Sequence, residues 1–335
     1  MKRISLGLSC AALVLAASGC GLTEKFPDRA VFVANGGSSS ISVIDPATGK
    51  VTDEIPIAAG FHPHHLALSP DGTRLAVAAP SMDLSMGHSG AHGSGATSKI
   101  YVFDSSSGTQ IAEADVDATV HNVAFLDFQT VAYAMMEHGM IVGASASDLK
   151  EKWTASVGMD PLEVTRISDD RALVANSGDD TVSIVDTALH TQLDAADVGG
   201  GPIAVWNTPA GLFISLETDK KVAVLSSGNL KDVTSTYDVG GVPGQVTSNA
   251  KGDAVWIAVE DRGVVEMRDP SNGKVVWTSD LGGKPHGLVI DDDAGLGYVT
   301  DEGASRVVRA KTSDGSLVDV IEVGDAPNGI VQRGL

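Results

Sequence analysis

The histidines of this 335-residue chain gather in a few short motifs. The sequence HPHH at 62–65 places three imidazoles within four residues, and the stretch SMDLSMGHSGAHGSGATSK at 81–99 holds His88 and His92. Imidazole nitrogens are common ligands of Zn(II) in proteins. The two methionines of the same stretch carry thioethers, which favour Cu(I). These residue types point to transition-metal binding if the fold brings them together.

A repeat of about 42 residues determines where these histidines lie. Each copy opens with a proline before a short apolar segment, as in HPHHLALSPDG, GPIAVWNTPAG and KPHGLVIDDDAG. The anchors are Pro63, Val120 in place of proline, Pro161, Pro202, Pro243, Pro285 and Pro327. The last four intervals are 41, 41, 42 and 42 residues. The longer interval before them, 98 residues, contains two repeats and a surplus that coincides with an insertion at 81–98.

Each repeat contains four short segments typical of β-strands, separated by turn sequences such as PDGT and SSSG. Seven copies of a four-strand unit predict an all-β fold, a seven-bladed β-propeller with four antiparallel strands per blade. The chain starts with a second strand, VFVAN at 31–35, and ends with a first strand, NGIVQR at 328–333. We therefore expect the C-terminal strand to join the N-terminal blade and close the ring.

Strand order places most of the histidines on one face of this propeller. With strands numbered outwards from the central channel, the loops between strands 2 and 3 lie on the same face as the crossovers between blades. Eight of the nine histidines belong to these two kinds of connection, and only His190 falls in a turn on the other face.

Alignment on the prolines predicts a metal site at the mouth of the channel. His64, His121 and His286 take equivalent positions in three repeats, and His65 and Glu163 are equivalent one residue later. Taken singly, His121 and His286 are also consistent with ordinary hydrogen-bonded channel residues. The insertion is long enough to fold over the mouth and to complete or gate the site. The predicted ligands are His64, His65, His121, His88, His92, Glu163 and His286, with Zn(II) preferred and copper as the alternative.

The N-terminus is typical of an export signal, with Lys2 and Arg3 before an apolar stretch at 4–17. The sequence AASGC resembles a bacterial lipobox, although Ala17 stands where that motif prefers leucine. An ordinary secretory signal cleaved nearby is the alternative. The expected organisation is a lipoprotein signal peptide at 1–19, a short tether at 20–28 after a lipidated Cys20, and the propeller at 29–335. Gly21 after that cysteine favours the outer membrane.

Composition excludes several classes of function. The two cysteines, Cys10 and Cys20, both lie in the signal region, so the mature domain has no thiolate site and no haem-attachment motif. No phosphate-binding glycine motif is present, so no nucleotide is expected. Without residues 1–19 the chain has 21 Lys and Arg against 43 Asp and Glu, a net charge of −22 that disfavours nucleic acid. Membrane attachment is expected through the lipid alone, and the protein is expected to be a monomer.

Three segments carry a family resemblance: YVTD at 298–301, VFVANGGSSSISVIDPATGKV at 31–51 and LVANSGDDTVSIVD at 173–186. They resemble the YVTN family of seven-bladed propellers, close to the YncE-like exported proteins. That resemblance implies a non-enzymatic binding or surface protein, although lactonases and lyases share the scaffold. MGHSGAHG together with HPHH is also similar in kind to periplasmic zinc metallochaperone propellers that supply ABC-transporter binding proteins.

The sequence thus predicts an exported, lipid-anchored propeller of the cell envelope that binds a metal ion and holds it or hands it over. The expected partner is a periplasmic metal-transport or envelope protein. Two alternatives stay open. One is a surface or protein-interaction propeller without a metal, and the other is a lactonase- or lyase-like enzyme that uses His64, His121 and Glu163 as acid–base groups.

Overall fold

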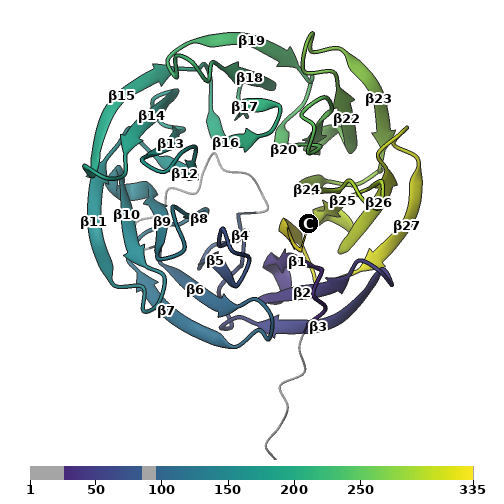
Figure 1. Cartoon of the computed structure of the whole chain (residues 1–335), viewed down its shortest axis with the longest axis horizontal. Helices are drawn as coiled ribbons and strands as arrows, with labels where there is room; N and C mark the ends of the chain where they lie inside the picture. The colour runs from purple at the N-terminus through teal and green to yellow at the C-terminus, as the bar shows by residue number, and fades with distance from the viewer. Residues whose placement is uncertain (1–25, 85–95, 335) are drawn as a thin grey trace, which may run out of the picture.

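A computed structural model describes residues 26–84 and 96–334 of the chain. Seven four-stranded antiparallel sheets surround a central channel, and Figure 1 shows this ring viewed along its axis. In the described residues the helical elements are four short 3-10 turns. The all-β seven-bladed propeller predicted from the repeat is therefore confirmed.

The blades are numbered here from the N-terminus, and their strands are given from the channel outwards. Blade 1 contains β28 (Pro327–Arg333), β1 (Ala30–Asn35), β2 (Ser40–Asp45) and β3 (Lys50–Pro56). Blade 2 contains β4 (His65–Leu68), β5 (Arg74–Pro80), β6 (Ser98–Asp104) and β7 (Gln110–Val116). Blade 3 contains β8 (Val123–Phe125), β9 (Thr130–Met135), β10 (Met140–Ser145) and β11 (Glu151–Ser156). Blade 4 contains β12 (Pro161–Arg166), β13 (Arg171–Asn176), β14 (Thr181–Asp186) and β15 (Thr191–Asp197).

The remaining blades follow the same order. Blade 5 contains β16 (Pro202–Thr208), β17 (Gly211–Leu216), β18 (Lys221–Leu225) and β19 (Val233–Asp238). Blade 6 contains β20 (Pro243–Ser248), β21 (Val255–Val259), β22 (Val264–Arg268) and β23 (Val275–Asp280). Blade 7 contains β24 (Pro285–Asp291), β25 (Leu296–Asp301), β26 (Arg306–Lys311) and β27 (Leu317–Glu322).

The first blade joins the two ends of the chain. Strand β28 pairs antiparallel with β1, with Val31 opposite Gln332 and Val33 opposite Ile330. The last strand therefore completes the sheet that the first strand begins, as the sequence predicts. This pairing removes the two exposed strand edges that an open array would leave.

The loops between strands 2 and 3 lie on the same face as the crossovers. Four of these loops contain the 3-10 turns η1 (Gly36–Ser38), η2 (Met136–His138), η3 (Glu260–Arg262) and η4 (Glu302–Ala304). Prolines begin the inner strands of five blades, where their fixed φ angle suits the entry into a strand. The insertion follows β5 and ends where β6 begins, so it belongs to the 2–3 loop of blade 2.

The core lies between neighbouring blades, where the aliphatic faces of adjacent sheets pack together. One cluster joins Phe32 of blade 1 to Val77 of blade 2, and another joins Trp256 of blade 6 to Val299 of blade 7. No helix among residues 26–84 and 96–334 is both long and apolar enough to span a bilayer.

Candidate metal centre

Three histidines from three blades converge at the channel mouth. His64 precedes β4, His121 precedes β8, and His286 is the second residue of β24. The ring centroid of His64 lies 4.3 Å from that of His121 and 5.7 Å from that of His286. All three side chains are buried. The proline alignment therefore predicted correctly which side chains meet across the axis.

His65 and Glu163 lie directly beside these rings. The Nε2 atom of His65 lies 3.1 Å from Oε1 of Glu163, and Nδ1 of His121 lies 3.0 Å from the same oxygen. The potential ligand atoms of His65, His121 and Glu163 all lie within 4.8 Å of one another. His64, His65 and His286 form a second group that meets the same limit, so His65 belongs to both.

A largely buried network of charged and polar side chains extends from His286 into neighbouring blades. The Nδ1 atom of His286 lies 2.7 Å from Oε1 of Glu260, which is in η3. The ammonium of Lys284 lies 3.5 Å from Oε2 of Glu260 and 2.6 Å from Oε2 of Glu302. Glu302 in turn accepts a hydrogen bond from the amide of Asn328. The network thus links the histidines to two further blades.

These carboxylates change the protonation of their neighbours. Burial opposes the charged imidazolium of His286, but the charge of Glu260 outweighs it and the pKa of His286 lies above its usual value. Burial likewise opposes the ammonium of Lys284, but Glu302 and Glu260 hold its pKa above the usual range. The network as a whole stabilises positive charge at this end of the channel.

The rim of the mouth has a polar arc and an apolar arc. The residue after each proline anchor faces the axis region, and in blades 1, 2, 3 and 7 this residue is asparagine or histidine. In blades 4 and 5 it is Leu162 and Ile203, which form one apolar cluster with Met136. Leu84 and Met82, from the start of the insertion, pack into the same cluster. The described start of the insertion therefore rests on the apolar arc, beside the histidines.

The structure places the remaining sequence candidates as follows. His88 and His92 lie outside the described residues, as do Cys20 and Met86, so their predicted roles stay predictions. Met82, one of the two methionines whose thioethers favour Cu(I), is partly buried because it packs with Leu84. His190 lies in the β14–β15 turn on the opposite face, as expected, and stacks on Trp153 at 4.7 Å.

Sequence reasoning missed a recurring glutamate, two copies of which, Glu260 and Glu302, belong to the network around His286. Glu217, Glu260 and Glu302 each follow the second strand of a blade, in three consecutive repeats. This recurrence of glutamate at one repeat position was the signal that could have revealed them. The ring of Trp206 lies 6.3 Å from that of His65, a contact that no sequence motif indicates.

Comparison with known proteins identifies the architecture. No family model and no curated protein matches the chain. Among solved structures, the periplasmic gluconolactonase PpgL of Pseudomonas aeruginosa superposes with a TM-score of 0.71 at 20% identity, covering 91% of this chain and 99% of that one. A functionally unknown protein from Desulfotomaculum acetoxidans gives a TM-score of 0.72 at 14% identity, with 91% and 98% covered. Apo AztD from Citrobacter koseri gives 0.58 at 11% identity, with 91% and 97% covered.

The chain is a seven-bladed β-propeller. At these identities the likeness concerns the fold alone, because propellers carry many unrelated functions. Function therefore has to be argued from the residues at the channel mouth.

Proposed function

We propose that this protein binds Zn(II) at the channel mouth through His65, His121 and Glu163, with His64 as the fourth ligand. The observation that carries the proposal is the position of Glu163. One of its oxygens faces imidazole nitrogens from two other blades at 3.0 and 3.1 Å, in a buried setting. His64 contacts both of these rings, with centroid distances of 4.7 and 4.3 Å.

The spacing of these atoms suits a tetrahedral zinc ion. Zinc bonds to nitrogen and oxygen of about 2.0–2.1 Å imply ligand atoms roughly 3.3 Å apart. The separations of His65 and His121 from Glu163 lie close to that value, and the ligand atoms of these three residues all lie within 4.8 Å of one another. His286 stands next to the ligands with its Nδ1 directed at Glu260, which is the arrangement by which carboxylates orient metal-binding histidines.

The donor set favours zinc over copper. Imidazole and carboxylate suit Zn(II), whereas Cu(I) prefers thioether and thiolate sulfur. The one described methionine of the insertion, Met82, packs against Leu84 and the apolar arc, so it is not presented as a sulfur ligand beside His65. A copper site would therefore need a sulfur ligand other than Met82.

We further propose that the protein holds or hands over the metal in the cell envelope, where the signal-like N-terminus and Cys20 would anchor it by lipid. The fold likeness to apo AztD and to periplasmic PpgL is consistent with an exported propeller. His88 and His92 would add ligands during transfer to an envelope partner.

Zinc titration of the purified, chelator-treated protein tests this proposal. We expect one equivalent of Zn(II) to bind. Loss of an outer-shell partner of a ligand typically weakens metal binding about 10–100-fold. The single variants His65→Ala and His121→Ala each remove a proposed ligand itself, so each should lose more zinc affinity than that. Competition with a chromophoric chelator measures the affinities.

His190→Ala is the matched control, because His190 lies on the opposite face of the ring. This variant should bind zinc as the wild type does. Substoichiometric binding by the wild type, or equal affinities in all three variants, would overturn the proposal.

A second candidate function is lactone hydrolysis, which the fold likeness to a gluconolactonase brings into consideration. A carboxylate between two imidazoles could act as a general base on water. Lactonase activity that survives chelation and is lost in Glu163→Gln would favour the enzyme over the metal carrier.

A further inference from the structure

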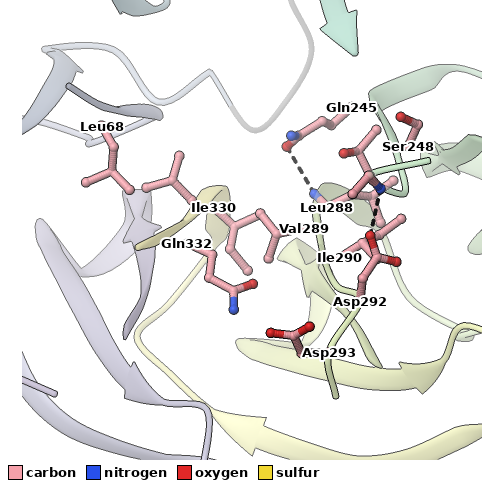
Figure 2. Close-up of a pocket in the computed structure, with 13 residues that line it drawn as sticks. Leu68, Gln245, Ser248, Leu288, Val289, Ile290, Asp292, Asp293, Ile330 and Gln332 are labelled. Atoms are coloured by element: carbon pink, nitrogen blue, oxygen red, sulfur yellow. Dashed lines mark hydrogen bonds between the residues drawn. The ribbon is translucent and has the colours of Figure 1, made fainter. Parts of the chain in front are cut away.

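The channel contains a cavity at the face opposite the histidines. It has a volume of about 530 Å³ and is lined by the inner strands β4, β20, β24 and β28 together with the β24–β25 turn. Figure 2 shows the 13 lining residues around this space. A volume of this size lies within the range of about 300–1,000 Å³ typical of small-molecule sites. None of the proposed metal ligands lines it.

The walls of the cavity are largely aliphatic. Leu68 and Ile330 project from neighbouring blades, and Leu288 and Val289 come from β24. Gln245 is fixed in place because its Oε1 accepts a hydrogen bond from the backbone of Leu288 at 3.0 Å. These walls would bury the apolar body of a ligand and release water from it.

The charge at the cavity entrance is negative. Asp292 and Asp293 both line the cavity and are exposed, and none of its described lining residues is a lysine, arginine or histidine. Asp292 also accepts a hydrogen bond from the backbone of Ala250 at 2.6 Å, which fixes its carboxylate at the wall. The nearby Arg29 is paired with Asp291 at 2.8 Å, so its charge is already balanced.

We infer that this cavity binds a small organic cation, an amine with an apolar body, whose ammonium group pairs with Asp293. Charge complementarity selects this occupant over an anion or a neutral molecule. An anion would face two carboxylates across a partly desolvated entrance. A neutral apolar molecule would gain burial but no ion pair, so it would bind less tightly than the amine.

Three probes with the same chain and different head groups test the inference: n-octylammonium, octan-1-ol and octanoate. We expect the affinity of the full-length protein to fall in that order, as measured by chemical-shift perturbation. Asp293→Asn should lower the affinity for octylammonium about fivefold, towards that of the alcohol, as expected for loss of one exposed ion pair.

Asp169→Asn is the matched control, since Asp169 lies in the equivalent turn of blade 4 and outside the cavity. It should leave all three affinities unchanged. A second variant, Val289→Thr, keeps the shape of the wall but makes it polar and should weaken all three probes alike. Equal binding of the three probes, no binding of octylammonium, or an unaltered affinity in Asp293→Asn would each overturn the inference.

The result is separable from that of the zinc titration. The cavity shares no residue with the proposed zinc ligands, so chelator-treated protein should bind octylammonium as tightly as zinc-loaded protein. If the protein bound octylammonium but not zinc, the proposed function would be overturned and the inferred amine site would stand.

Discussion

At the scale of single residues, Glu260 orients one of the histidines that surround the proposed zinc site. The carboxylate of Glu260 lies 2.7 Å from Nδ1 of His286, and Glu260 acts on the proposed zinc ligands only through that histidine. A carboxylate in this position fixes the orientation of the imidazole through its Nδ1. Glu260 is therefore a positioning residue.

Glu260→Gln should weaken zinc binding by up to about 10-fold, the lower end of what an outer-shell partner contributes, because an amide orients His286 less strongly and the His286 ring lies 5.7 and 5.6 Å from those of the proposed ligands His64 and His65. An NMR titration of the chelator-treated variant should also show a lower pKa for His286 than in the wild type, because the charge of Glu260 holds that pKa above its usual value. Glu302→Gln is the variant with which the zinc affinity of Glu260→Gln is compared, since Glu302 occupies the same repeat position but contacts Lys284 and Asn328. Equal zinc affinities in wild type and Glu260→Gln would contradict a positioning role.

The sequence was sufficient to place the histidines at the channel mouth but not the residues that support them. His64, His121 and His286 could be placed because a repeat of constant length maps equivalent residues onto equivalent points of a ring. Glu260 could not be placed, since its approach to the axis depends on the 3-10 turn η3. The partial burial of Met82 could not be predicted from the sequence, because it depends on Leu162 and Ile203, which belong to blades two and three positions away.

At the scale of elements, the inner strands lie so close together that glycine is required between them. The amide of Gly329 in β28 donates to the carbonyl of His64 at 2.8 Å. A Cβ atom on Gly329 would lie 2.5 Å from that oxygen and 2.9 Å from Cα of His65. Backbone atoms cannot move aside as a flexible side chain can. The position of the His64–His65 segment therefore depends on a small residue in the neighbouring blade.

Gly329→Ala should lower the free energy of unfolding by about 1–3 kcal/mol, the usual range for overpacking. It should also weaken zinc binding, because the segment it displaces contains the proposed ligands His64 and His65, the second of which begins β4. Urea denaturation and the zinc titration measure the two effects. Gly36→Ala is the control, since a Cβ there would meet its neighbours at an ordinary 3.5 Å. Wild-type stability in Gly329→Ala would show that the strands can separate without cost.

At the scale of the whole molecule, the tyrosines are distributed around the ring and buried between its blades. The chain has four, namely Tyr101 in β6, Tyr133 in β9, Tyr237 in β19 and Tyr298 in β25. Burial raises the pKa of each phenol, and that of Tyr133 reaches about 12. Four different blades therefore hold a group that resists ionisation only while the ring is folded.

This arrangement predicts that the ring unfolds cooperatively in alkali. The unfolded chain releases its phenolic protons near pH 10, whereas the folded chain retains them, so stability falls as the pH rises above about 10. Tyrosinate absorbance and circular dichroism should therefore change together in one transition. Tyr133→Phe removes one ionisable group from the core and should move that transition to higher pH. Tyrosinate appearing below pH 10 in protein that keeps its native circular dichroism would contradict the burial of these phenols.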